Sequence, residues 1–156
     1  MLNIVLFEPE IPANTGNIIR LCANTGAELH LIQPLGFLLD DKRLRRAGLD
    51  YHEWVNIHQY ANLQDYCERA QPKRLFAMTT KGSRQYSDVE YVSGDALMFG
   101  PESRGLPAEF LHTQPAERRL YIPMKAESRS LNLSNTVAIA LFEAWRQMNF
   151  SGALIK

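Results

Sequence analysis

Short apolar runs alternate with helix-like segments along almost the whole chain, and this alternation limits the possible folds more than any other feature of the sequence. The runs lack a helical period, so they predict buried strands. Strands that alternate with helices predict an α/β fold, in which a parallel sheet carries helices on both faces. We expect strands at residues 2–7, 29–33, 54–57, 74–79, 96–99 and 119–122, and helices at 14–25, 42–47, 62–70 and 107–112, with the start of a last helix in the stretch 131–140.

The ends of two of these helices carry capping residues. Asn14 is expected to be the N-cap of the 14–25 helix, and Gly26 its stop. Asn132, Ser134 and Asn135 are cap-type residues at the start of the last helix, where they could simply cap and solvate a helix end. The apolar residues of this last helix recur at three- and four-residue spacing and predict one buried face, formed by Val137, Ala140, Leu141, Ala144, Trp145 and Met148.

Three loops follow the ends of expected strands, at residues 78–82, 100–105 and 122–131. In a parallel α/β sheet, ligands bind beyond the carboxyl ends of the strands. With 156 residues, the chain is most simply a single domain covering 1–156, so the three loops should meet at one edge of one sheet. This convergence predicts the position of the functional site.

Composition and charge exclude several classes of protein. The formal net charge is zero, so a surface for a nucleic acid must be local or arise by oligomerisation. Cys22 and Cys67 are too few and too far apart for a metal cluster, and a reduced cytoplasmic compartment is the default. The four histidines are scattered without ligand spacing, so we expect no metal. No apolar run reaches the length that spans a membrane, and none resembles a signal peptide.

The loops also lack the common phosphate-binding motifs. There is no Gly-x-Gly-x-x-Gly and no Walker loop, so dinucleotide and triphosphate sites lack their usual cradle. Gly100 and Gly105 permit close approach of the backbone, while Pro101, Pro107 and Pro123 stiffen the chain around them. A rigid cup of backbone donors and acceptors suits a flat heteroaromatic group such as adenine.

Three segments together resemble the motifs of the SPOUT-class RNA 2′-O-ribose methyltransferases. They are Asn-Thr-Gly-Asn-Ile-Ile-Arg at 14–20, Phe-Gly-Pro-Glu-Ser-Arg-Gly at 99–105, and Ile-Pro at 122–123 with Ser-Leu-Asn-Leu-Ser-Asn at 130–135. Each segment alone is weakly specific, but the three occur in order over the whole chain. The minimal length and the basic segment at 41–51 resemble the branch that methylates the wobble ribose of tRNA, at cytidine or uridine 34.

This resemblance implies a C-terminal trefoil knot, a homodimer and bound S-adenosylmethionine. It also implies that leucine isoacceptors of tRNA are the substrates. The cofactor contacts, carried over by motif position, are Met78, Gly100, Ile122, Ser130 and Leu131. Several of them would act through backbone groups, which accounts for their chemically inert side chains.

Arg20 is the residue that the resemblance links to activation of the ribose hydroxyl. Without the flanking motif it would be interpreted as a solvated helix arginine, off the apolar face of the 14–25 helix. A guanidinium scarcely deprotonates in proteins and is therefore a poor general base. We expect Arg20 to hold the adjacent phosphate and to stabilise the developing alkoxide.

Residues 42–46 contain four cations in five positions, the one dense basic patch on a neutral chain. Such a run is often only a solvated helix face, but an RNA enzyme needs a basic surface. We therefore expect Lys42, Arg43 and Arg46 to contact RNA. Secondary candidates near the predicted site are Lys81, Arg84 and Arg129.

Two further hypotheses concern pairing. Glu102 and Arg104 are expected to set loop geometry by pairing with each other or with a neighbouring subunit. The last helix is more aromatic than one buried face requires, which favours a homodimer formed by this helix and the first one.

Two alternatives to wobble methylation remain open at this stage. One keeps the chemistry on another tRNA position or on ribosomal RNA, and the other is a non-catalytic RNA-binding module.

Overall fold

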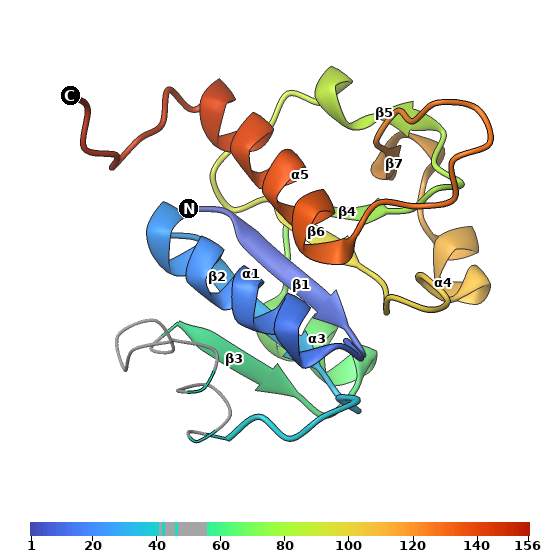
Figure 1. The fold of residues 1–156 in the computed structure, drawn as a ribbon. Coiled ribbons are helices and arrows are strands. Elements are labelled where there is room, and N and C mark those ends of the chain that lie inside the picture. The colour runs from blue at the N-terminus through green and yellow to red at the C-terminus, as the bar shows by residue number, and fades with distance from the viewer. Residues whose placement is uncertain (41, 43–45, 47–55) are drawn as a thin grey trace.

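The computed structural model describes residues 1–40, 42, 46 and 56–156, and its ribbon is shown in Figure 1. Helices and strands alternate in these residues, as predicted. In chain order the elements are β1 (Asn3–Phe7), α1 (Pro12–Thr25), β2 (Glu28–Ile32), β3 (Ile57–Tyr60), α3 (Leu63–Ala70), β4 (Leu75–Met78), β5 (Arg84–Gln85), β6 (Ala96–Phe99), α4 (Ala108–Thr113), β7 (Arg119–Tyr121) and α5 (Leu133–Gln147), with 3₁₀ turns at Tyr86–Asp88 and Ala116–Arg118.

The strands described here form one seven-stranded sheet in the order β3-β2-β1-β6-β4-β7-β5. Every neighbouring pair is parallel. The central pair, β1 and β6, runs in register from Asn3 beside Ala96 to Leu6 beside Phe99. The loops that follow β1, β6, β4 and β7 therefore leave the same edge of the sheet, and this edge carries the site described below.

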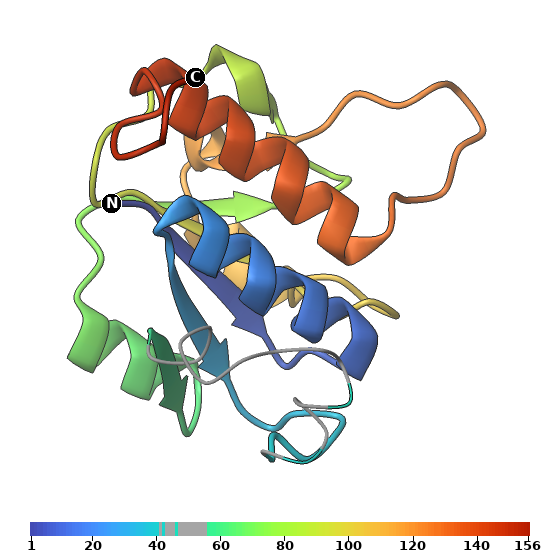
Figure 2. The same cartoon turned by 60° about the vertical axis from the view of Figure 1, so that its left-hand side comes forward.

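Helices cover both faces of the sheet, as predicted. Helices α1 and α5 lie side by side on one face, in the views of both Figure 1 and Figure 2. Alternate strand residues divide between two apolar clusters, because successive side chains of a strand point to opposite faces. In β1, Ile4 and Leu6 pack in the cluster with α1 and α5, whereas Val5 packs with residues of α3 and α4.

Most predicted elements are confirmed to within two residues, with two exceptions among the strands. The strand predicted at 54–57 overlaps β3 only at Ile57, since Asn56 lies in a turn and β3 runs on to Tyr60 beside β2, while residues 54 and 55 lie outside the described residues. The two-residue strand β5 is absent from the prediction. The predicted 42–47 helix lies outside the described residues except for Lys42 and Arg46, which are both helical.

The prediction that Asn14 caps the first helix is wrong. Helix α1 begins at Pro12, and Ile11 occupies the N-cap position without a side-chain hydrogen bond. Proline is favoured at the first helical position because its φ is already helical and its missing N–H needs no partner there. The stop at Gly26 is confirmed, since its φ of 74° is left-handed.

The start of the last helix is confirmed. The Asn132 side chain caps α5 by accepting hydrogen bonds from the backbone N–H groups of Ser134 and Asn135. The buried face consists of Leu133, Val137, Ala140, Leu141 and Ala144, while Trp145 and Met148 are only partly buried against it. The trefoil knot stays a prediction.

Candidate functional site

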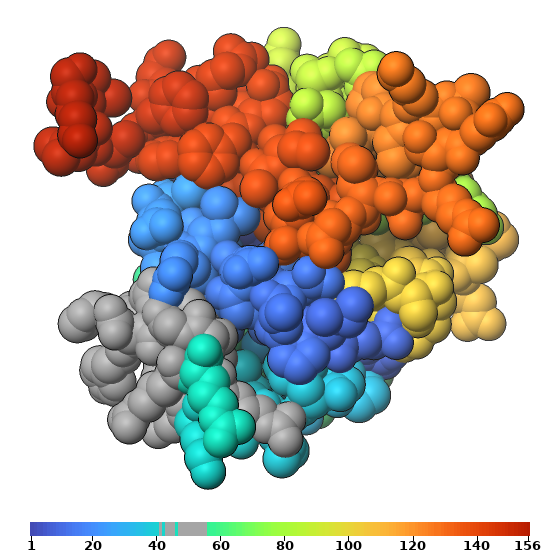
Figure 3. All heavy atoms as spheres, viewed as in Figure 1, coloured from blue at the N-terminus to red at the C-terminus, as the bar shows by residue number. Residues whose placement is uncertain are grey.

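A cavity of about 640 Å³ lies at the carboxyl edge of the sheet. In Figure 3 the surface is hollowed between the orange 122–132 segment and the yellow 100–105 segment. All three predicted loops contribute, together with the N-termini of α1 and α5, the start of β7 and one side of α4. The lining residues are Ile11, Asn14, 78–81, 99–106, Ala108, Leu111, His112, Arg119, Ile122, Met124, 129–133 and Thr136.

The structure brings all five predicted cofactor residues together around this one cavity. Met78 ends β4, Gly100 follows β6, Ile122 follows β7, and Ser130 and Leu131 lie just before α5. They come from positions up to 53 residues apart in the sequence. Their role in binding the cofactor stays a prediction, but their shared location is what the convergence of the three loops requires.

Gly100 can only be a glycine in this backbone. A Cβ added there would lie 2.2 Å from both the carbonyl carbon of Gly105 and the nitrogen of Leu106. Both are backbone atoms, so the clash cannot be relieved by rotating a side chain. The loop after β6 therefore folds tightly back on itself, which places its backbone groups against the cavity.

Glu102 joins this loop to the N-terminus of α1. Its carboxylate accepts hydrogen bonds from the backbone N–H of Glu10 at 2.7 Å, from that of Ile11 at 3.1 Å, and from Asn14 Nδ2 at 3.3 Å. Helix N-termini carry unsatisfied N–H groups and a partial positive charge, so a carboxylate is well placed there. The carboxylate thus binds the two residues that precede α1 and, through Asn14 Nδ2, the first turn of the helix.

The loop after β6 also donates hydrogen bonds to the loop after β1. The Glu10 carboxylate accepts from Ser103, at 3.0 Å from the backbone N–H and 2.7 Å from the hydroxyl. The backbone hydrogen bond from Ser103 is the largest cause that lowers the pKa of Glu10 below its ordinary value. Arg104 forms an ion pair with Glu8.

Glu102 and Arg104 therefore do not pair with each other, which was one of the two predicted arrangements; pairing with a neighbouring subunit stays a prediction. Both residues do set loop geometry, but each bonds to the loop after β1. The reason is the sheet order: β1 and β6 are adjacent and parallel, so their following loops lie next to each other.

Asn14 and Asn132 connect the first and third motifs. Asn132 Nδ2 donates to Asn14 Oδ1 at 3.0 Å, while its own Oδ1 caps α5. Asn14 is buried, at 5% exposure, and its Nδ2 donates to Glu102. One hydrogen-bonded chain thus runs from the 100–105 loop through α1 to the start of α5, and fixes three walls of the cavity relative to one another.

Comparison with known proteins agrees with this arrangement. A profile described as the SpoU rRNA Methylase family matches residues 1–142. The chain belongs to this family. A protein of Photorhabdus asymbiotica named tRNA (cytidine(34)-2′-O)-methyltransferase is 63% identical, over 100% of this chain and 99% of its own length.

Two solved structures of RNA methyltransferases superpose over nearly the whole chain. One, described as giving insight into the 2-OH methylation of C/U34 on tRNA, has a TM-score of 0.88 and 45% identity, and covers 96% of this chain and 97% of its own. The other is an AdoMet-bound rRNA methyltransferase from Sinorhizobium meliloti, with a TM-score of 0.81 and 29% identity over 94% of this chain and 56% of its own. The SpoU-type architecture of the sheet and its helices is thereby established.

Within this SpoU-family fold, Arg20 does not line the cavity of its own chain. It is exposed on α1, six residues after Asn14, which does line the cavity. Six residues advance a helix by about 9 Å and turn it by about 240°, so Arg20 and Asn14 lie on different sides of α1. Helix α1 therefore presents Arg20 on its outer surface.

The residues predicted to contact RNA lie elsewhere. Lys42 and Arg46 are exposed, and Arg43 lies outside the described residues. Neither Lys42 nor Arg46 lines the cavity, so RNA contact by this segment stays a prediction. Of the secondary candidates, Lys81 and Arg129 do line the cavity, whereas Arg84 does not.

Two side chains at the cavity, those of Arg119 and Asn14, were not among the predicted site residues. Arg119 lines it, although it lies in a strand and in no motif. The alternation of apolar and polar residues along β7 could have indicated it. Leu120 is fully buried, and the neighbouring Arg119 must point to the opposite face of the sheet. Asn14 opens the first motif, but the only role predicted for its side chain was a helix cap, because a local pattern cannot reveal a partner 118 residues away.

Among the described residues there is no group of three histidine, cysteine or acidic residues that could hold a metal ion. His30 is buried against Tyr60 and Asn3, 2.8 and 3.1 Å from its ring nitrogens, and burial lowers its pKa to about 4. His30 thus has a structural role in the sheet. A search of the described residues also found no helix that is long and apolar enough to span a membrane.

Proposed function

We propose that this SpoU-family chain transfers a methyl group from S-adenosylmethionine to the 2′-oxygen of the ribose at position 34 of tRNA, a cytidine or uridine. The full-length match to a relative of that name carries the proposal. The cavity described above supports it, because all five motif residues expected to bind the cofactor line it. The cytoplasm is the expected compartment.

The cavity fits S-adenosylmethionine in size and in chemistry. Its volume of about 640 Å³ falls within the range of roughly 300–1,000 Å³ that is usual for small-molecule sites. Met78, Ile122 and Leu131 supply apolar surface for a purine, and the folded loop at Gly100 supplies backbone donors and acceptors. The bound cofactor supplies an electrophilic methyl group on its sulfonium sulfur.

Arg20 acts on the ribose rather than on the cofactor. The 2′-hydroxyl loses its proton as its oxygen takes the methyl group, so negative charge develops on that oxygen. A guanidinium remains protonated and can stabilise this charge while holding the neighbouring phosphate. The proton passes to water or to a phosphate oxygen, and Arg20 is the catalytic residue in this scheme.

The position of Arg20 makes a second subunit part of the proposal. Helices α1 and α5 pack side by side, and their outer surfaces carry Arg20 on α1 and Ile139 and Phe142 on α5, the last two 37% and 45% exposed. The N-termini of both helices form one side of the cavity. A second copy on this surface lies beside the cavity, so that its Arg20 can complete a site that one chain leaves without this residue.

We expect the protein to be a homodimer at micromolar concentration, with twice the monomer mass by light scattering. Phe142→Glu should shift the mass toward that of the monomer, because it places a charge where an apolar surface would be buried. Cys67→Glu is the matched control, since Cys67 is exposed on α3, on the opposite face of the sheet. A monomer mass for the unmodified protein would contradict this interface.

The function is tested by reacting the purified protein with S-adenosylmethionine and unmodified tRNA transcripts, followed by mass spectrometry of nucleosides and oligonucleotides. We expect one 2′-O-methylated nucleotide, at position 34. A transcript with 2′-deoxyribose at position 34 is the control and should gain no methyl group. Methylation at another tRNA position, or of ribosomal RNA alone, would replace the wobble assignment by the first alternative. A protein that binds tRNA and methylates neither RNA would support the non-catalytic one.

A further inference from the structure

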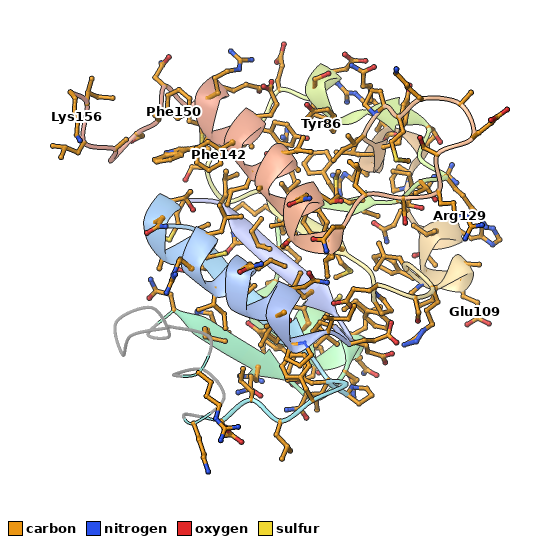
Figure 4. The ribbon with its side chains drawn as sticks, viewed as in Figure 1. Tyr86, Glu109, Arg129, Phe142, Phe150 and Lys156 are labelled. Atoms are coloured by element: carbon orange, nitrogen blue, oxygen red, sulfur yellow. The ribbon has the colours of Figure 1, made fainter. Side chains whose placement is uncertain are left out.

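Three cationic residues line the cavity on segments next to β4, β7 and α5. Lys81 lies in the loop after β4, Arg119 begins β7 beside it, and Arg129 lies in the loop before α5. In Figure 4 Arg129 projects from that loop on the side of α4. The described structure contains no ion pair or side-chain hydrogen bond for any of the three, whereas Arg104, also in the lining, pairs with Glu8.

No carboxylate in the lining is available to balance these charges. Glu102 is the acidic residue of the cavity wall, and its oxygens already accept from Glu10, Ile11 and Asn14. Glu8, outside the lining, is occupied by Arg104. The cavity lining therefore has an excess of positive charge on a chain whose net charge is zero.

Arg119 is the most deeply placed of the three. Its Nε is buried and has no hydrogen-bond partner in the structure. Leu120 is fully buried against the α1–α5 cluster, so Arg119 points to the face of the sheet that carries α4. Buried N–H donors nearly always have an acceptor, and the planar guanidinium fork matches the two oxygens of a carboxylate or a phosphate.

We propose that Arg119 forms the base of an oxyanion-binding subsite in this cavity, with Lys81 and Arg129 at its outer edge. The oxyanion is carried either by the cofactor, as the carboxylate of its amino-acid part, or by the RNA, as a backbone phosphate. This proposal rests on the proposed function, since both sources are ligands of that reaction.

Calorimetry with two cofactor-related ligands tests the first source. S-adenosylhomocysteine carries the carboxylate, and 5′-methylthioadenosine keeps the adenosine and thioether without it. If the carboxylate occupies the subsite, Arg119→Gln should weaken binding of S-adenosylhomocysteine about tenfold or more, the scale of one charge-assisted hydrogen bond. Binding of 5′-methylthioadenosine should be unchanged. The matched control is Arg118→Gln, because Arg118 is the neighbouring arginine and does not line the cavity.

Binding of tRNA at several salt concentrations tests the second source. If a phosphate occupies the subsite, Arg119→Gln should leave S-adenosylhomocysteine binding unchanged. It should also lower the slope of log affinity against log salt by about 0.7–0.9, the value for one lost phosphate contact. Arg118→Gln should retain the slope of the unmodified protein.

Unchanged binding of both S-adenosylhomocysteine and tRNA in Arg119→Gln would overturn the subsite. A variant with an altered thermal unfolding midpoint is replaced by Arg119→Met, which keeps an unbranched apolar stem but removes the guanidinium and its charge, and the same outcomes apply. Failure of the unmodified protein to bind either ligand would instead contradict the proposed function, so the two failures are distinguishable.

Discussion

Arg20→Ala is expected to lower the single-turnover rate of tRNA methylation by roughly 10²–10³, the scale of losing one donor to a developing oxyanion. Affinity for S-adenosylhomocysteine should stay normal, because Arg20 does not line the cavity of its own chain. Raising the tRNA concentration to saturation should not restore the rate. Asn24→Ala, an exposed change one turn further along α1, is the matched control and should leave the rate unchanged.

The basic segment provides the contrasting case. If Arg43 and Arg46 bind phosphates, replacing both by alanine should mainly weaken tRNA binding. The salt slope should then fall by about 0.7–0.9 for each lost contact. Saturating tRNA should restore most of the rate in this double variant. The opposite result would mean that the catalytic and binding roles are reversed. In that case saturating tRNA would restore the rate of Arg20→Ala, and the double variant would stay slow.

Gly100→Val is expected to abolish measurable binding of S-adenosylhomocysteine by calorimetry. Any side chain at this position places its Cβ 2.2 Å from backbone atoms of Gly105 and Leu106, so the loop that lines the cavity must move. Gly100→Ala should have the same direction of effect, because the clash begins at the Cβ itself. Circular dichroism and thermal unfolding establish whether each variant retains its fold.

Gly105→Ala separates this steric effect from backbone strain. Gly105 has a φ of 68°, but a Cβ added there meets no atom within 4 Å. The change should therefore cost roughly 1 kcal/mol of stability, the penalty of a left-handed residue with a side chain, and leave cofactor binding nearly intact. Normal binding in folded Gly100→Ala and Gly100→Val would show that the cofactor does not use this cavity.

The alternation of strands and helices was predictable from the sequence because it depends on local periodicity. Met78 and Gly100 could be placed at the site because parallel strands end at one edge of a sheet, whatever the details of packing. The stop of α1 at Gly26 and the cap of α5 at Asn132 were likewise predictable, since both depend on a few consecutive residues.

The partners of polar side chains were not predictable in this way. Glu102 accepts a hydrogen bond from Ile11 across 91 residues, and Asn14 bonds to Asn132 across 118, because β1 lies beside β6 in the sheet and α1 packs beside α5. Local patterns led to the wrong expectation that Asn14 is a cap, and to pairing between Glu102 and Arg104 as one of two expected arrangements. A side chain satisfies its hydrogen bonds with whatever the fold brings near it, and sequence distance does not limit that choice.

The sequence by itself thus determined the class of fold, the loops that form the site and, through the three motifs, the resemblance that indicates the chemistry. Only the tertiary structure decided that Arg20 faces away from the cavity of its own chain and that Arg119 faces into it. The physical reason is that the direction of a side chain depends on how its helix or strand packs. The orientation of α1 depends on hydrogen bonds from Ile11 to Glu102 and from Asn132 to Asn14, and that of β7 on the burial of Leu120 in the α1–α5 cluster. In each case the partners are distant in the sequence.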